Sequence, residues 1–427
     1  MSHDSSTDAC GLDFGTSNSE IGILRAGSPS LVEVENGRPR IPTTIFFDDT
    51  TRDDVFGEAA IARFLEGQPG RMLWAIKSVL GTALQGEATI VRGRRIAFEE
   101  IITRILRNLK AKGDEAAGRE LTRVVLGRPV RFNDSDDALD RAAEEILRRS
   151  ARGAGFAQVE VELEPIAAGL ELETHIDREQ IAAVVDIGGG TSDFSVIRLT
   201  PAAQHRRVAD RERILAVGGI HIGGTDFDRQ LSVTQLMPHL GLGASYRNDR
   251  GDVLQMPQWV FHDLASWLRI NFIYDTRMLD GIYDILSKNK DGDRRLARLD
   301  RVLSAHLGHT LAREVERTKI SLSGDETVTT PLDWIERRFG LTVTRTELNA
   351  AITELLDDAV RELENVLRAS GVKNDAFDVV FFTGGGSLLP EVRTRVRQLL
   401  PNAKAFDTDQ FGGIALGLTL EAGRIFA

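Results

Sequence analysis

Residues 184–197 read VVDIGGGTSDFSVI, an order that predicts a strand, a glycine turn and a returning strand. The β-branched residues on both sides of the turn suit a buried, pleated surface. Three consecutive glycines let backbone N–H groups approach a ligand and form a concave nest for phosphate oxygens. The carboxylates of Asp186 and Asp193 bracket the turn and suit an anion that carries hydrated Mg²⁺. The stretch therefore indicates a holder for magnesium-nucleotide phosphates, or a hairpin whose glycines serve the turn alone.

Residues 11–24 read GLDFGTSNSEIGIL and repeat this order of apolar strand, aspartate, glycine and hydroxyl turn, and returning strand. Asp13 and Asp186 occupy equivalent places in the two copies. An internal repeat of this length predicts two related lobes, each with one phosphate hairpin, that could hold one triphosphate between them. Neither copy is a Walker A loop, because no Gly-Lys-Ser/Thr follows and the returning segment is a strand.

The bulk properties of the chain narrow the class of protein. Its 427 residues suffice for two sizeable cores, and its net charge of −11 argues against nucleic acid or an anionic membrane as the main partner. The single cysteine, Cys10, permits no internal disulfide. The polar start of the chain does not read as a signal peptide, and no apolar run approaches ~18 residues. We therefore expect a cytoplasmic protein without a membrane span.

Strands and helices alternate through the first half of the chain, which predicts a mostly parallel α/β layer. Within it, Lys77 stands alone in an apolar context, where a surface lysine is the usual explanation. Glu164 precedes Pro165 at a strand–helix junction, so its carboxylate either caps the helix or points into a cleft. Asn133 and Ser135 are candidate N-caps of the helix that contains residues 138–147.

The second half of the chain carries further candidate features. Gly223 and Gly224 lead into a helix with acidic residues in its first turn, a helix start that favours anions. Glu316 and Lys319 share one helix face, and a solvated ion pair would also explain them. Thr346 is the candidate cap of a long amphipathic helix. Aromatic residues are interleaved between residues 236 and 308, where core packing is favoured over a partner surface.

Six short motifs occur in an order that resembles a known superfamily. They read DFGT at 13–16, EPIAAG at 164–169, DIGGGT at 186–191, HIGGTDFD at 221–228, ERTKISLS at 316–323 and TGGGS at 383–387. Together they resemble the actin/sugar-kinase/heat-shock ATPase superfamily, and most closely the nucleotide-binding domain of the DnaK-type 70-kDa heat-shock chaperones. The resemblance covers nearly the whole chain.

The resemblance implies a two-lobed α/β fold of the actin-like ATPase type, made of duplicated ribonuclease-H-like domains. Lobe I would span residues 9–183, and lobe II residues 184–427 with a subdomain insertion at about 230–310 and the final helix. The chain ends where such chaperones continue into a linker, so we expect a stand-alone member without the C-terminal peptide-binding domain.

The resemblance also implies roles for the matched residues. Lys77, Glu164, Asp186 and Thr191 would be catalytic, with Lys77 near the γ-phosphate, and Asp13, Asp186 and Asp193 would hold Mg²⁺ through water. The phosphates of ATP or ADP would meet Gly15, Thr16, Ser17, Asn18, Gly188, Gly189, Gly190, Thr191, Gly223 and Gly224. The nucleoside would meet Glu316, Lys319, Ser323, Gly384, Gly385 and Gly386. Ile320 and Leu388 stand where the family usually has two arginines beside adenine, so apolar contact would replace stacking on a guanidinium.

These roles imply a chaperone-like, ATP-binding protein that hydrolyses ATP slowly with Mg²⁺, by positioning and electrostatic stabilisation. Hydrolysis would switch lobe closure and thereby an unidentified protein partner or client. One alternative is a nucleotide-binding, actin-like scaffold or polymer with little turnover. A less favoured alternative is a small-molecule kinase, which needs a second ligand pocket.

Overall fold

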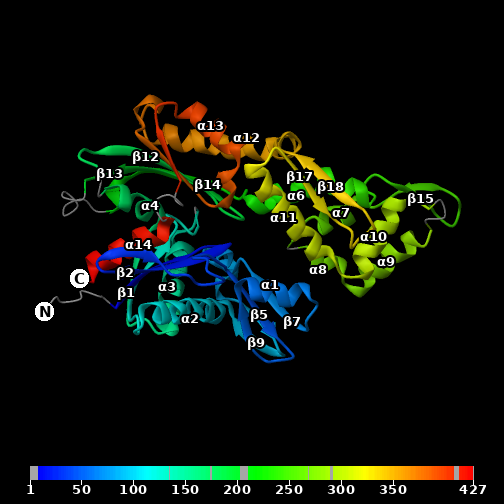
Figure 1. Cartoon of the computed structure of the whole chain (residues 1–427), viewed down its shortest axis with the longest axis horizontal. Coiled ribbons are helices and arrows are strands. Elements are labelled where there is room, and N and C mark those ends of the chain that lie inside the picture. Colours follow the sequence, from blue (N-terminus) through cyan, green and yellow to red (C-terminus); the bar gives the residue numbers. More distant parts are fainter. Residues whose placement is uncertain are drawn as a thin grey trace.

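The computed structural model describes residues 8–133, 135–173, 176–201, 210–267, 269–288, 292–407 and 413–426, which form two lobes (Figure 1). The large sheet of the first lobe has the order β11 (Gln158–Leu163), β10 (Arg123–Arg128), β1 (Ala9–Phe14), β2 (Asn18–Arg25) and β3 (Ser28–Leu31), with β4 (Ile41–Pro42) paired to β2. The large sheet of the second lobe has the order β20 (Lys404–Asp407), β19 (Val379–Thr383), β12 (Gln180–Ile187), β13 (Ser192–Leu199) and β14 (Ile214–Ile220).

The two large sheets have the same topology. In each sheet, three strands consecutive in sequence form an antiparallel meander. A later strand pairs in parallel with the first strand of the meander, and the last strand pairs in parallel with that later strand. The first two strands of each meander are the hairpins that carry Asp13 and Asp186. The predicted duplication and the predicted two-lobed α/β fold are therefore confirmed.

Two helices, α4 (Glu164–Glu173) and α14 (Gly413–Ile425), lie between the large sheets (Figure 1). Helix α14 packs against β1, β2 and β10, and α4 packs against α14 and β13. A Cβ atom on Gly417 would lie 1.9 Å from the carbonyl oxygen of Ala167, so the two helices approach closely at this glycine. Sequence order predicts α14 in the second lobe, whereas its contacts are with the first sheet and α4. The boundary between residues 183 and 184 stays a prediction.

Long amphipathic helices cover the outer faces of the sheets. Helices α2 (Phe98–Ala117) and α3 (Asp137–Ala154) pack on the first sheet, and α12 (Arg345–Ala369) packs on the second beside α13 (Pro390–Leu399). The N-cap of α12 is Thr344 rather than the predicted Thr346, because Thr344 forms a capping box with Glu347. The N-cap of α3 is Asp136, which accepts from two N–H groups of the first turn, rather than Asn133 or Ser135.

Smaller elements complete each lobe (Figure 1). The first lobe adds β5 (Thr44–Asp48), β6 (Asp54–Phe56), α1 (Gly57–Leu65), β7 (Gly70–Trp74), η1 (Ile76–Val79), η2 (Ala83–Gly86), β8 (Ala88–Val91) and β9 (Arg94–Ala97). The second lobe adds α5 (Asp210–Arg213), α6 (Gly224–Leu231), η4 (Ser232–Leu236), η5 (Met237–Leu240), β15 (Ser245–Arg247), β16 (Val253–Gln255), α7 (Gln258–Leu264), α8 (Ile270–Ile273), α9 (Thr276–Leu286), α10 (Arg294–Ser304), α11 (Gly308–Gly324), β17 (Thr327–Pro331), β18 (Gly340–Thr344), η6 (Asn374–Ala376) and η7 (Gly385–Leu388). In the described part of the chain, no helix is both long and apolar enough to cross a membrane.

Candidate functional site

The two glycine hairpins meet at their tips. The turn between β1 and β2 contains Ser17, and the turn between β12 and β13 contains Gly189. A Cβ atom on Gly189 would lie 2.0 Å from Oγ of Ser17, so the turns of the two lobes are in direct contact. The second turn is closed by a hydrogen bond from the N–H of Gly188 to the carbonyl oxygen of Thr191, at 2.9 Å. The structure thus places the two candidate phosphate hairpins opposite each other.

Lys77 lies beside these hairpins and is buried. Its ammonium donates to Oε1 of Glu164 at 2.7 Å, across 87 positions of sequence. Burial opposes the positive charge, but the carboxylates of Glu164, Asp13 and Asp186 outweigh it and raise the pKa of Lys77. The surface-lysine interpretation is therefore wrong. Glu164 pairs with Lys77 and also lines a small cavity. Of its two predicted arrangements, these contacts favour the carboxylate directed toward a cleft.

The carboxylates around Lys77 repel one another. Burial, together with the charges of Glu164 and Glu20, raises the pKa of Asp13 to about 7, although Lys77 opposes this. Burial and the charge of Asp193, followed by those of Glu164 and Asp13, raise the pKa of Asp186 well above its ordinary value. Raised pKa values at two neighbouring acids indicate negative charge that one lysine does not balance, which fits a bound divalent cation.

The side chains of the described residues do not form a site that would coordinate this cation directly. Among the described residues, no group of three or more His, Cys, Asp or Glu side chains lies close enough together to hold a metal ion. Mg²⁺ commonly keeps several of its waters and binds proteins through one or two carboxylates. The role of Asp13, Asp186 and Asp193 in holding Mg²⁺ through water, which the resemblance implies, stays a prediction.

The segment before α6 packs against the second hairpin. The N–H groups of Gly224 and Thr225 donate to the carbonyl oxygens of Gly188 and Gly189 at 2.9 and 2.8 Å. A Cβ atom on Gly223 would lie 2.6 Å from the carbonyl oxygen of Gly189, so glycine is required for this contact. The N-terminus of α6 is thereby fixed beside the candidate phosphate turn.

Helix α11 carries Glu316, Lys319 and Ser323, which are spaced along one helix face. Lys319 is buried and donates to the carbonyl oxygen of Gly224 at 3.0 Å and to Asp228 at 2.9 Å. Burial and the charge of Asp228 raise the pKa of Glu316. The alternative of a solvated pair is wrong for Lys319, which instead ties α11 to the start of α6.

The third glycine element lies against the end of β12. Gly384 has a φ of +75°, and a Cβ atom there would lie 2.6 Å from Oδ1 of Asp186. On Gly386, a Cβ atom would lie 2.4 Å from Cγ2 of Ile187. Gly385 and Gly190 are different, because no atom lies within 4 Å of where their Cβ would be. These two glycines therefore leave backbone uncovered in the second and third glycine elements, as a ligand cradle requires.

The expected positions beside the base are occupied by exposed apolar side chains. Ile320, on α11 next to Lys319, is 59% exposed, and Leu388, at the end of η7, is 40% exposed. Both lie on elements that carry candidate nucleoside residues. Exposed apolar side chains leave apolar surface that a ligand can cover. Ile320 and Leu388 are therefore candidate contacts for a base.

One contributor to the site went unpredicted. Glu20 lies directly opposite Asp13 in the β1–β2 hairpin and forms an ion pair with Arg40. The alternation of side chains along a hairpin places cross-strand partners on one face, so the register of the repeat could have indicated Glu20. The sequence around Arg40 does not indicate this role, because Arg40 reaches Glu20 only through the path of the loop after β3.

A sequence model described as Hsp70 protein matches residues 9–237 and 275–425 of this chain. These two segments contain each of the hairpins, the Lys77 segment, α4, α11 and the third glycine element. The unmatched residues between them lie in the outer part of the second lobe, which carries β15, β16 and α7.

Proposed function

Because this chain belongs to the Hsp70 family, we propose that it binds Mg²⁺-ATP between its lobes and hydrolyses it slowly. The observation that carries the proposal is the ion pair between Lys77 and Glu164, which lies among Asp13 and Asp186 at the contact of the two hairpins. Family membership supports a nucleotide-binding, chaperone-like ATPase in general. The particular mechanism depends on the two hairpins and on the charged residues between them.

The backbone N–H groups of residues 15–18 and 188–191 bind the phosphate oxygens, with the start of α6 beside them. The ammonium of Lys77 faces the γ-phosphate and offsets charge that moves onto its oxygens. Asp13, Asp186 and Asp193 would hold Mg²⁺ through water, and the ion would supply positive charge that neutralises the phosphates. Glu164 holds Lys77 in place and, with Asp186, accepts hydrogen bonds from the attacking water. Thr191, whose hydroxyl donates to Asp193 at 2.9 Å, orients the same region.

The nucleoside lies between α11 and the third glycine element. The ammonium of Lys319 has three N–H donors. It donates to the carbonyl oxygen of Gly224 and to the carboxylate of Asp228, so one N–H remains for a ribose hydroxyl. Ile320 and Leu388 cover the base by apolar contact. Hydrolysis changes the closure of the lobes and, through that change, the affinity for a protein partner or client in the cytoplasm.

Single-turnover hydrolysis of Mg²⁺-ATP tests this proposal, with the wild type beside Lys77→Ala and Asp186→Asn. We expect slow hydrolysis by the wild type without any acceptor, and variants that bind nucleotide but stall. Tight binding with no turnover would instead favour the scaffold or polymer, and light scattering on addition of ATP would detect assembly. Turnover that requires an added hydroxyl acceptor would favour the kinase.

A further inference from the structure

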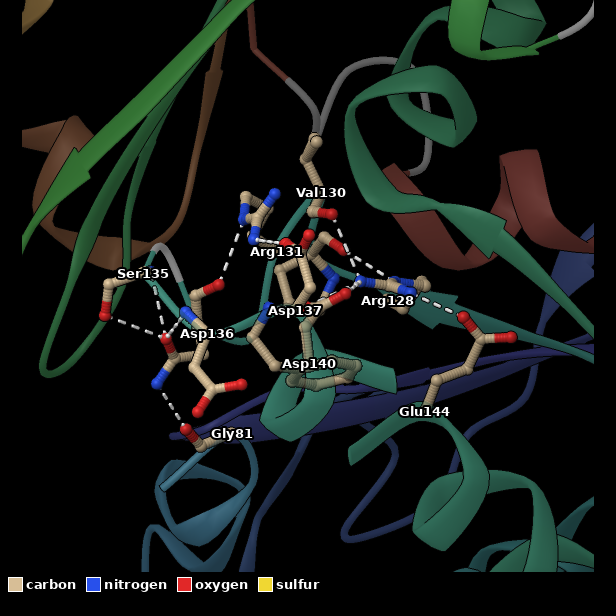
Figure 2. Close-up of polar contacts among 12 residues, drawn as sticks. Gly81, Arg128, Val130, Arg131, Ser135, Asp136, Asp137, Asp140 and Glu144 are labelled. Atoms are coloured by element: carbon tan, nitrogen blue, oxygen red, sulfur yellow. Dashed lines mark hydrogen bonds and ion pairs between the residues drawn. The ribbon is translucent and has the colours of Figure 1, made fainter. Parts of the chain in front are cut away.

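The loop that follows β10 is held by Arg128, whose side chain is buried. Its guanidinium donates to the carbonyl oxygens of Pro129 and Val130, at 2.9 and 3.1 Å. It also pairs with Asp140 and Glu144 of α3 (Figure 2). A planar guanidinium that meets this many acceptors fixes the groups around it. The start of the loop is therefore anchored to α3.

The same loop reaches the segment that carries Lys77. The side-chain amide Nδ2 of Asn133 donates to the carbonyl oxygen of Gly81 at 2.7 Å. A Cβ atom on Gly81, whose φ is +77°, would lie 2.2 Å from the carbonyl oxygen of Phe132, so the two backbones are in close contact. Asp140 accepts from the N–H of Phe132 at 2.6 Å, which connects this contact to α3.

Gly81 follows the short helix η1, on which Lys77 lies. The N–H of Leu80 donates to the carbonyl oxygen of Lys77 at 3.0 Å, so the two ends of this segment are coupled. Ala75, just before η1, has a φ of +53°. A non-glycine residue keeps such a conformation only where its surroundings enforce it. The conformation of residues 75–81 therefore depends on contacts from outside, and Asn133 supplies one of them.

The loop also borders the carboxylates of the site. One cavity of about 50 Å³ is lined by Pro129, Val130, Arg131, Glu164, Asp186 and Asp193, among others. A displacement of the loop therefore changes the surroundings of Glu164 as well as the segment of Lys77, and these two residues form the ion pair of the site.

We propose that Asn133 is a positioning residue, which holds Lys77 against Glu164 through its hydrogen bond to Gly81. This proposal rests on the proposed function, because it adds a residue to the same site. The competing role of Asn133 is local, since its Oδ1 accepts from the N–H groups of Ser135 and Asp136 at 2.9 and 2.7 Å and so shapes the turn before α3.

The two roles use different atoms of one side chain and can be separated by substitution. Asn133→Asp keeps the acceptor oxygen that shapes the turn, but it replaces the donor to Gly81 by a second oxygen that repels the carbonyl. Asn133→Ala removes both interactions. Ser135→Ala, which loses only a hydroxyl contact to Asn133 at 3.2 Å, is the matched control.

Two measurements follow on each variant. The first is acetylation of Lys77 by acetic anhydride in the nucleotide-free protein, quantified by mass spectrometry. The second is the single-turnover rate constant of Mg²⁺-ATP hydrolysis, with the dissociation constant of ATP measured separately. We expect Asn133→Asp and Asn133→Ala to be acetylated at Lys77 several-fold faster than the wild type. Their hydrolysis should be slower by roughly tenfold or more at nearly unchanged affinity, because small misplacements of a reacting group are costly.

Unchanged acetylation of Lys77 in Asn133→Asp would overturn the proposal, whatever the hydrolysis data show. A hydrolysis defect in Asn133→Ala that Asn133→Asp rescues would also overturn it, because that pattern assigns Asn133 to the turn alone. Absence of turnover in the wild type would count against the proposed function, while the acetylation result would still decide whether Asn133 positions Lys77.

Discussion

Arg313 on α11 forms an ion pair with Glu58 on α1, so the second lobe is joined directly to the outer part of the first. Aromatic rings reinforce this contact. The ring centroids of Trp74 and Trp267 lie 4.9 Å apart, and His309 packs edge-on against Trp267 at 4.8 Å. The described parts of the lobes are thus connected through α4 and α14, through the tips of the two hairpins, and through this outer contact. Under the proposed function, we expect a nucleotide bound between the lobes to enter and leave past the outer contact.

Loss of the ion pair should speed the release of nucleotide. For Arg313→Met and Glu58→Gln we expect release of a fluorescent ATP analogue to accelerate about two- to fivefold, since a partly exposed ion pair contributes about 0.2–1 kcal/mol. Stopped-flow displacement measures this rate. The double variant should be no faster than the single ones, and equal release from all four proteins would show that the contact does not restrain the cleft.

The outer contact should weaken in acid. Burial lowers the pKa of His309 to about 4, below its ordinary value of 6.5. A base with a lowered pKa in the folded state binds fewer protons there than in the unfolded chain, so its contribution to stability is complete above pH 6.5 and is lost as the pH falls toward 4. Urea unfolding between pH 7 and 4.5 measures the loss. The slope of stability against pH should be shallower for His309→Phe than for the wild type.

The affinity for Mg²⁺ should depend on pH near neutrality. The raised pKa of Asp13, about 7, means that the nucleotide-free protein keeps a proton there which cation binding must release. Stability from this group is complete below about pH 4 and is lost as the pH rises through 7, because the folded state binds the extra proton. Titration calorimetry in two buffers of different ionisation enthalpy should detect proton release with Mg²⁺-ADP. Asp13→Asn should abolish that release, and a wild type that releases none would refute the assignment.

An arginine at residue 320 should strengthen nucleotide binding. Ile320 is exposed on α11, and a guanidinium there could stack on a base, an interaction of about 0.5–2 kcal/mol or roughly 2- to 30-fold in affinity. Fluorescence titration with ATP and GTP measures the effect on Ile320→Arg. Leu254→Arg, an exposed position on β16, is the control that should change nothing. Equal affinities in all three proteins would mean that the base does not lie beside α11.

Two adjacent glycines should respond differently to a methyl group. Gly384→Ala forces an unfavourable φ and places Cβ 2.3 Å from the carbonyl oxygen of Ile187, so we expect a stability loss of about 1 kcal/mol or more. Gly385→Ala meets no atom within 4 Å and should leave stability unchanged while it lowers the affinity for ATP. Thermal unfolding and ATP titration of both variants check this. If Gly385→Ala binds ATP normally, Gly385 does not face the ligand.

The features that local sequence patterns govern were predicted well. Apolar alternation and glycine turns fix the two hairpins because strand period and turn chemistry act within about ten residues. The predicted N-caps of α3 and α12 were wrong by one to three residues. Several hydroxyl or carboxylate side chains lie near each helix start, and only backbone geometry selects among them.

The sequence by itself determined that two related lobes each present a glycine hairpin with an aspartate before the turn. The sequence determines this because each copy of the repeat consists of residues that are adjacent along the chain. Only the tertiary structure decided that Lys77 meets Glu164, that Asn133 donates to the carbonyl oxygen of Gly81, and that α14 covers the first sheet. These relationships join residues tens to hundreds of positions apart. They depend on which buried groups are brought together when the chain packs, and a local sequence pattern does not predict such long-range contacts.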